Sequence, residues 1–168
     1  RRNTPLRPMM IGGGQERKRR GGTSNAPGII GLGAACQILH ELSDAGMEQV
    51  GALRDQLEAE LRRRFQDILI LGAAAERLPN TCCACFPGLS SEPLVMLLSE
   101  NGICVSSGAA CSSGSLEPSR VVQAMGIEPR IGQGQIRFSL GRFNTAADIQ
   151  RLFEVLPQVV EKVSRANL

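Results

Sequence analysis

The sequence predicts a mixed domain in which helices alternate with strands and pack in layers, an α/β or α+β fold. Apolar residues recur at helical spacing in several stretches, and short runs typical of strands lie between them. Hydrophobic residues make up 42% of the 168 residues, which is enough for a globular core. No run of eighteen apolar residues and no secretory signal pattern is present, so we expect a cytoplasmic protein without a membrane span.

The chain is expected to begin with a basic loop and to continue in two helices. Residues 1–25 are rich in Gly, Pro and Arg, lack any regular period, and carry seven Arg and Lys residues against a single glutamate. A helix is expected from Pro27, because proline suits a first turn and Asn25 is a suitable cap. The sequence SDAG at 43–46 interrupts the helical pattern, and a second amphipathic helix then runs to about Phe65.

The rest of the chain is expected to alternate short strands with helices. The strands are bounded by Gly, Pro, Asn and Ser, and they are expected at 67–73, 80–86, 103–107 and 135–142. The helices are expected at 91–102, with Ser90 or Ser91 as cap, and at 117–126 and 145–166. Pro118 would occupy the first turn of the second of these helices, and Pro157 would kink the third.

A cysteine in a loop of small residues is the first candidate site. Residues 106–119 read SSGAACSSGSLEPS, so the Cys111 thiol has little to pack against. Two interpretations stay open on composition alone: a flexible turn between a strand and a helix, and a nucleophile on a mobile tether. The single histidine, His40, lies in the first expected helix, so a Cys–His pair as in papain-like enzymes has little support.

The cysteines at 82–85 are a weak candidate for a metal site. On a strand, Cys83 and Cys85 share one face and Cys82 points to the other, so only two sulfurs converge. No further CxxC pair or histidine cluster completes four ligands, so we expect no metal and interpret these residues as small buried apolar side chains. Cys111 should be the cysteine most sensitive to alkylation. The apolar patterns around four others predict that they are shielded: Cys36, Cys83, Cys85 and Cys104.

The second candidate site is GGGQERKRRGGT at 12–23. Glycine N–H groups, arginines and the Thr23 hydroxyl just before a helix are the materials of a phosphate-binding loop. It is not a P-loop, because no Gly-Lys-Ser/Thr sequence follows. A basic surface loop or a nucleic-acid patch fits the same composition, although the absence of Trp and Tyr removes most platforms for stacking bases and makes nucleic acid an unlikely partner.

Four stretches, taken in chain order, resemble a known family. They are GGGQERKRRGGTSN at 12–25, RLPNT at 77–81, SSGAACSSGSLEPS at 106–119 and IRFSLGRFNT at 136–145. Together they are similar to the NifS/IscS-like cysteine desulfurases, pyridoxal-phosphate enzymes of the aspartate-aminotransferase fold (fold type I of the PLP-dependent transferases). The resemblance implies the C-terminal portion of such an enzyme. Residues 1–43 would end the large cofactor-binding domain, and residues 44–168 would form the small domain.

The resemblance implies roles for three residues. Cys111 would be the catalytic cysteine, which takes the sulfur of L-cysteine as a persulfide and leaves L-alanine. Arg137 would pair with the substrate carboxylate, and Thr23 would reach the phosphate of the partner subunit's cofactor in a homodimer. A mobile loop suits this chemistry, because the thiol must reach the substrate and then a sulfur acceptor or scaffold protein in iron–sulfur cluster or thio-cofactor assembly.

The sequence also departs from the family's pattern. Lys18 stands where the family has glycine, and Ser24 where it has glutamate. The family's Schiff-base lysine lies upstream of the first residue here, and the two lysines of this chain, Lys18 and Lys162, match no such motif. We therefore expect the chain alone to bind no pyridoxal phosphate covalently and to be inactive. Two alternatives remain: a selenocysteine lyase or related lyase of the same fold, and a non-catalytic sulfur-carrier or interaction module.

Overall fold

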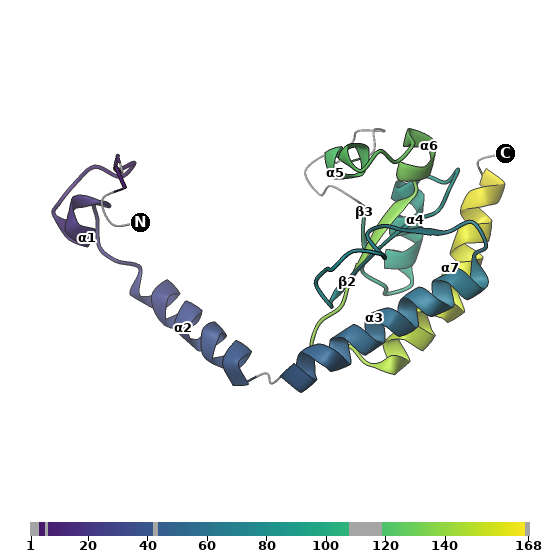
Figure 1. Ribbon diagram of the computed structural model, residues 1–168, viewed down its shortest axis with the longest axis horizontal. Coiled ribbons are helices and arrows are strands. Elements are labelled where there is room, and N and C mark those ends of the chain that lie inside the picture. Colours follow the sequence, from purple (N-terminus) through teal and green to yellow (C-terminus); the bar gives the residue numbers. More distant parts are fainter. Residues whose placement is uncertain (1–3, 6, 42–43, 108–118, 167–168) are drawn as a thin grey trace. The chain divides into compact units, whose positions relative to one another are not determined.

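The computed structural model describes residues 4–5, 7–41, 44–107 and 119–166 (Figure 1). The chain divides into two compact units, Arg1–Ser43 and Asp44–Leu168, and each is described by itself. Within the described residues, no helix is long and apolar enough to cross a membrane.

The first unit combines a glycine-rich loop, the short turn α1 (Gln15–Lys18) and the helix α2 (Ala26–Glu41). Asn25 caps α2 as expected, since its Oδ1 accepts a hydrogen bond from the Gly28 N–H at 3.1 Å. No residue of α2 is buried, although the helix is strongly apolar. Its exposed large apolar side chains are Ile29, Ile30, Leu32, Ile38 and Leu39.

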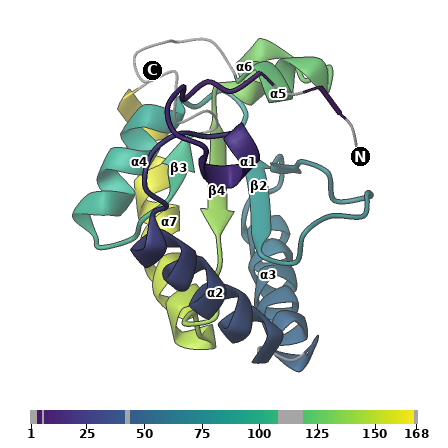
Figure 2. The ribbon, with the colours of Figure 1, turned by 90° about the vertical axis from the view of Figure 1, so that its left-hand side faces the viewer.

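The second unit is an antiparallel sheet with helices on both faces. The strands lie in the order β1-β2-β4-β3 and comprise β1 (Leu69–Ile70), β2 (Thr81–Cys85), β3 (Ser106–Ser107) and β4 (Gln135–Ser139). The helices are α3 (Asp44–Arg64), α4 (Ser91–Glu100), α5 (Arg120–Ala124), α6 (Pro129–Gly132) and α7 (Ala146–Ala166). Figure 2 shows β2 and β4 side by side at the centre of this sheet. The expected mixture of helices and strands is confirmed.

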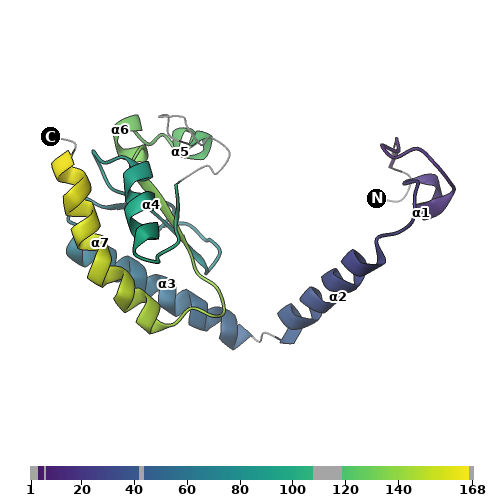
Figure 3. The same cartoon turned by 180° about the vertical axis from the view of Figure 1, so that it is seen from behind.

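One face of the sheet is apolar and carries the main core. Cys82 pairs with Phe138 and Ala84 with Ile136, and these four side chains pack against α3, α4 and α7. In Figure 3, α3 and α7 run side by side on this face of the unit. The largest fully buried side chains of the core are Leu57, Leu61, Leu94, Leu98, Ile136 and Leu156.

The opposite face of the sheet is mixed in character. A small cluster of Leu71, Cys85 and Val122 is buried there, and α5 and α6 contribute to it. Cys83 packs against the same cluster, which confirms that Cys83 and Cys85 share a face away from Cys82. Because Cys83 pairs with Arg137, the arginine belongs to this face as well.

The start of α5 differs from the expectation. The helix begins at Arg120, and Pro118, which was expected in its first turn, lies outside the described residues. Ser119 is the N-cap instead, and its hydroxyl oxygen accepts the Val122 N–H at 3.3 Å. A serine side chain thus satisfies one of the free N–H groups of the first turn.

Other boundaries also differ. The strand expected at 103–107 is only Ser106–Ser107, because the Ile103 N–H bonds to the Leu98 carbonyl at 2.9 Å and so joins the end of α4. Helix α6 was not expected. Pro157 lies inside α7, and the kink expected there stays a prediction. Ser90 occupies the N-cap of α4 without a side-chain hydrogen bond.

A buried ion pair ties α3 to the segment that precedes β2. Glu58 is 5% exposed, and its carboxylate oxygens lie 2.6 Å from Arg77 Nη1 and 2.8 Å from Arg77 Nη2. The hydrogen bond that Arg77 donates to the Glu58 carboxylate raises the pKa of Arg77. Each charge is largely removed from water, so each depends on the other for stabilisation.

We expect Arg77→Met to lower the free energy of unfolding by about 3 kcal/mol, because the Glu58 carboxylate would stay buried without its partner. The double variant Arg77→Met/Glu58→Leu should recover most of that loss. Urea denaturation followed by circular dichroism measures both values. Arg151→Met, which breaks the exposed Arg151–Glu154 pair, is the matched control and should change little. Equal stability of the single and double variants would contradict the role of the pair.

Gly134 precedes β4 at a position without room for a side chain. A Cβ there would lie 2.0 Å from the Phe86 carbonyl oxygen, and the Phe86 N–H bonds to the Gly134 carbonyl at 3.0 Å. Gly134→Ala should therefore lower the free energy of unfolding by about 2 kcal/mol or more, since backbone must move. Gly141→Ala is the matched control, because a Cβ at Gly141 would meet only Asn144 Oδ1 at 4.0 Å. If the two variants had equally low melting temperatures, this explanation would be contradicted.

Candidate functional site

Arg137 lies in the middle of the central strand β4, on the mixed face of the sheet. Its paired neighbours are Cys83 on β2 and Ser106 on β3. Side chains of directly paired residues lie close together on one face, so a thiol and a hydroxyl flank the base of the guanidinium. The strand pairs on both sides restrict the backbone of Arg137, which favours a fixed direction for a forked donor.

Arg137 is half-buried, and no carboxylate pairs with it among the residues that the structure describes. The other half-buried arginines of this unit do have such partners, because Arg54 lies 2.7 Å from Asp55 and Arg77 pairs with Glu58. A guanidinium that has lost part of its hydration and has no carboxylate partner among the described residues favours the binding of an anion. Arg137 is therefore a candidate for binding a carboxylate.

The thiol beside Arg137 is held by a glutamine. Gln135 Nε2 donates a hydrogen bond to Cys83 Sγ at 2.8 Å. Burial raises the pKa of the Cys83 thiol, and the Gln135 hydrogen bond and the charge of Arg137 offset only part of this effect. Cys83 is therefore mostly a neutral thiol near pH 7.

Two cysteines are more exposed than the sequence indicated. Cys36 and Cys104 are both exposed, whereas the apolar patterns around them predicted shielding. Cys104 lies in the irregular segment before β3, where no strand alternation hides it, and Cys36 lies on α2, which has no buried residue. Cys82 and Cys85 are buried, and burial raises the pKa of Cys85 to about 12 and that of Cys82 as well.

Cys111 lies outside the described residues, so its role stays a prediction. The ends of the segment that carries it are described. β3 ends at Ser107, four positions before Cys111, and Ser119 caps α5 on the other side. Since Ser106 pairs with Arg137, the cysteine loop starts on the strand next to the candidate carboxylate-binding residue.

The basic loop of the first unit closes on itself at two glycines. The Gly21 N–H donates to the Met10 carbonyl at 2.8 Å, and a Cβ at Gly21 would lie 2.8 Å from both Cα and N of Gly12. Only glycine permits this approach of two backbones. A hollow of about 160 Å³ lies inside the loop, and its lining includes Gly12, Gly13, Gly14, Lys18 and Gly21.

The turn α1 within this loop has an unusual backbone. Glu16, Arg17 and Lys18 have φ angles of 51°, 58° and 65°, in the left-handed region. Residues with a side chain adopt this region at a cost, whereas glycine adopts it freely. Lys18, which stands where the cysteine desulfurase family has glycine, thus adopts a left-handed backbone conformation that favours glycine. The sequence pattern indicated an irregular loop and gave no signal for this turn.

Thr23 lies exposed between the basic loop and α2. Its carbonyl accepts a hydrogen bond from Arg20 Nη1 at 3.2 Å, and its hydroxyl has no partner among the described residues. A free hydroxyl, glycine N–H groups and several cationic side chains form a donor set suited to a phosphate. Thr23 and Arg137 belong to different units of the chain.

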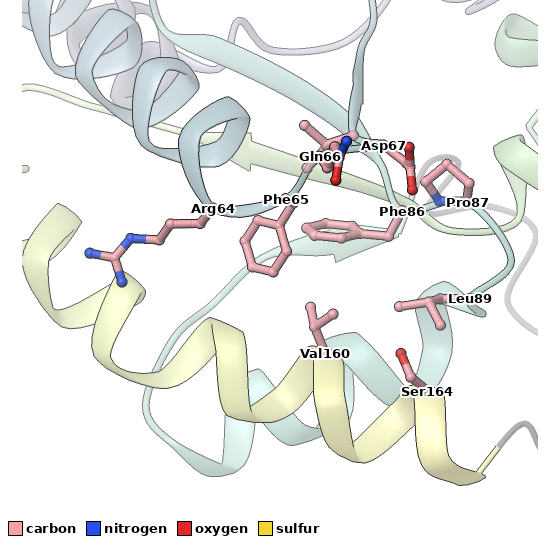
Figure 4. A pocket seen from close by; sticks show the side chains of 10 residues that line it. Arg64, Phe65, Gln66, Asp67, Phe86, Pro87, Leu89, Val160 and Ser164 are labelled. Atoms are coloured by element: carbon pink, nitrogen blue, oxygen red, sulfur yellow. The ribbon is translucent and has the colours of Figure 1, made fainter.

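Two further features of the described residues bear on the choice of site. They include no group of three His, Cys, Asp or Glu side chains that could hold a metal ion. A cavity of about 290 Å³ lies between the end of α3 and α7, where the rings of Phe65 and Phe86 meet edge to face with centroids 5.4 Å apart (Figure 4). Neither of the buried polar atoms that lack a hydrogen-bond partner lines it, so nothing there indicates a ligand.

Comparison with known proteins gives a family match over most of the chain. Residues 7–152 match the family model described as Aminotransferase class-V. The chain is 47% identical over 163 residues to a cysteine desulfurase of Cereibacter sphaeroides, which is 97% of this chain and 41% of that protein. The chain thus spans about two fifths of the length of the curated relatives it matches.

Solved structures show the same fold. The chain is similar to the X-ray structure of a NifS-like protein from Rickettsia africae ESF-5, with a TM-score of 0.84 and 30% identity, over 95% of this chain and 41% of that one. A second structure described as a NifS-like protein gives a TM-score of 0.79 and 35% identity, over 98% and 40% of the two chains. The described elements therefore form part of the fold of PLP-dependent transferases of fold type I.

Exposure and pKa together predict how the described cysteines react with N-ethylmaleimide. Cys104 and Cys36 should react first, Cys83 more slowly, and Cys82 and Cys85 only after unfolding. Because the pKa of Cys83 is raised, its thiolate fraction and its rate should increase about tenfold from pH 7 to pH 8. Timed labelling with peptide mapping measures the order. Labelling of Cys82 or Cys85 before Cys104 in the folded chain would contradict it.

Proposed function

The chain belongs to the class-V aminotransferase family, and from this premise we propose that it is part of a pyridoxal-phosphate-dependent cysteine desulfurase. The relatives named cysteine desulfurase support this reaction. The observation that carries the proposal is the half-buried Arg137 guanidinium, which has no carboxylate partner among the described residues and lies beside the strand from which the Cys111 loop starts.

Arg137 would bind the carboxylate of L-cysteine. Its guanidinium offers two parallel N–H donors, which match the two oxygens of a carboxylate. The strand pairs to Cys83 and Ser106 would keep this fork in place, so that the substrate is oriented before the chemistry begins. A lysine at the same position would supply the charge but not the fork.

Cys111 would accept the sulfur. In this step the Cys111 sulfur bonds to the sulfur of L-cysteine, the substrate carbon–sulfur bond breaks, and its electron pair remains on carbon. That carbon takes up a proton to give L-alanine, and the persulfide on Cys111 then passes its outer sulfur to an acceptor or scaffold protein. We assign iron–sulfur cluster or thio-cofactor assembly as the use of this sulfur.

Pyridoxal phosphate is the cofactor that the family implies, and the chain offers a fit for its phosphate. The Thr23 hydroxyl, the neighbouring glycine N–H groups and the basic loop would hold the phosphate of the partner subunit's cofactor in a homodimer. When bound, pyridoxal phosphate supplies an electron sink for the bonds at the amino acid's α-carbon. Neither Lys18, on a strained turn, nor Lys162, exposed on α7, is assigned to its covalent attachment.

The organisation of the chain fits this proposal. We assign residues 1–43 to the end of a large cofactor-binding domain and residues 44–168 to a small domain. The exposed apolar side chains of α2 support the first assignment, since a helix of this composition is normally covered by further protein. The 168-residue chain alone would then be inactive. The complete enzyme would act in the cytoplasm, where the free thiols of the described cysteines are stable.

The experiment uses a protein that carries these residues within the full length of the family. We expect Arg137→Lys to raise the KM for L-cysteine at least about tenfold with a smaller change in kcat, because one prong of the carboxylate contact is lost. Arg130→Lys, on the exposed surface of α6, is the matched control and should leave both constants unchanged. An unchanged KM for Arg137→Lys would remove Arg137 from the substrate site.

A further inference from the structure

The register between β2 and β4 brings the side chains of Cys83 and Arg137 close together. The Leu140 N–H bonds to the Asn80 carbonyl at 2.8 Å, three positions along the same ladder from the pair of Cys83 and Arg137. Such bonds join every second pair of an antiparallel ladder, so Cys83 and Arg137 form a non-hydrogen-bonded pair. The side chains of a non-hydrogen-bonded pair lie closer together than those of a hydrogen-bonded pair.

The Cys83 side chain keeps part of its surface accessible. β2 lies between β1 and β4, so neighbouring strands cover the backbone of Cys83 on both sides. The accessible surface therefore belongs mainly to the side chain, whereas Cys82 and Cys85 are buried. Cys83 also lines a cavity of about 340 Å³ between β2, β4 and α5, whose mostly apolar wall includes Leu71 and Val122. Cavities of this size can hold a small organic molecule.

Two polar groups act on the Cys83 sulfur. Gln135 Nε2 donates a hydrogen bond to Sγ at 2.8 Å. Burial raises the pKa of the Cys83 thiol, and the Gln135 hydrogen bond and the charge of Arg137 offset part of this effect. A thiol that is mostly neutral reacts slowly with reagents from bulk water, so a neighbouring group that binds the reagent decides which reagents react.

Arg137 is the neighbour that can bind such a reagent. Its guanidinium has no carboxylate partner among the described residues. Arg77, the arginine in the wall of the cavity, lies 2.6 Å from the Glu58 carboxylate, so its charge is already compensated. An anion near Cys83 therefore gains most from Arg137. Two methylene groups between a sulfur atom and a carboxylate cover about 5 Å, which is the spacing of paired side chains.

We propose that Cys83 is a thiolation site for small disulfides that carry a carboxylate, and that Arg137 holds this carboxylate. The Cys83 thiol gives its proton to solvent, and its sulfur attacks one sulfur of the disulfide. A new sulfur–sulfur bond forms while the old one breaks, and the leaving sulfur takes the electron pair and then a proton. Cys83 is thereby oxidised, and the released half of the disulfide is reduced to a thiol.

This site deepens the proposed function, because it rests on the carboxylate-binding role of Arg137. The disulfide of L-cysteine carries the same carboxylate group as L-cysteine itself. A carboxylate tethered to Cys83 occupies Arg137 and so excludes the carboxylate of free L-cysteine. Thiolation of Cys83 is thus a block of substrate binding that a thiol reductant reverses.

3,3′-Dithiodipropionate and its diamide are matched reagents, because they share one skeleton and only the first carries carboxylates. The readout is the rate at which each forms a mixed disulfide at Cys83 in the 168-residue chain, with the exposed Cys104 as reference. Every chain carries Cys111→Ser, so that no disulfide passes from that thiol. Relative to Cys104, Cys83 should prefer the acid by at least about tenfold, the factor for one hydrogen bond to a charged group. Acid quenching and peptide mapping by mass spectrometry measure both rates.

Three variants test the role of the arginine. Arg137→Gln removes the charge, so the preference of Cys83 for the acid should disappear. Arg137→Lys keeps the charge without the fork, so part of the preference should remain. Arg130→Gln, on the exposed surface of α6, is the matched control and should leave the preference unchanged. Continued protection of the buried Cys82 and Cys85 shows that each variant is folded.

Three results would overturn the proposal. They are an equal ratio of the two rates at Cys83 and Cys104, a preference for the acid that survives Arg137→Gln, and a protein of the full family length in which Cys83 reacts with neither reagent. The KM of full-length Arg137→Lys separates this proposal from the proposed function. A raised KM without the preference at Cys83 would contradict the thiolation site alone, whereas an unchanged KM with the preference would contradict only the substrate role of Arg137.

Discussion

The antiparallel pairing of β2 with β4 is the constraint on which the rest of the structure depends. Its register places Cys82 opposite Phe138 and Cys83 opposite Arg137. The first pair points into the core formed with α3, α4 and α7, and the second points to the other face. A shift of one residue would put the guanidinium into the apolar core, so packing of one face fixes the chemistry of the other.

The same pairing explains why one face of the sheet carries polar side chains such as Arg137 while the other face carries the apolar core. The Glu58–Arg77 ion pair and the hydrogen bond from Arg77 Nη1 to the Thr81 carbonyl hold the segment before β2 in place. Among the described residues of the second unit, Arg137 is the half-buried arginine without a carboxylate partner. This follows from its position on a paired strand, where no acidic residue is its strand neighbour.

Local features could be predicted from the sequence where they depend on neighbours in the chain. The capping of α2 by Asn25, the strand at 80–86 and the division of its cysteines between two faces all follow from local pattern. The meeting of Gln135, Cys83 and Arg137 could not be predicted, because it depends on the register between strands that lie far apart in the sequence.

Other failures have equally physical causes. The exposure of Cys104 was missed because a strand was expected from residue 103. The Ile103 N–H bonds to the Leu98 carbonyl at the end of α4 instead, so Cys104 lies outside the strand and its thiol is exposed. The left-handed turn at Lys18 was missed because nothing in a lysine's propensity indicates positive φ. The cysteine loop was recognised from its composition and from a family resemblance, and Cys111 itself lies outside the described residues.

The central claim is that Cys111 accepts sulfur from a substrate that Arg137 holds. The most direct measurement is the yield of L-alanine and of protein-bound persulfide from L-cysteine, in a full-length protein with and without Cys111→Ala. The account predicts that this variant forms neither product while its absorbance still shows bound pyridoxal phosphate. Turnover by the variant equal to that of the unaltered protein would contradict the account.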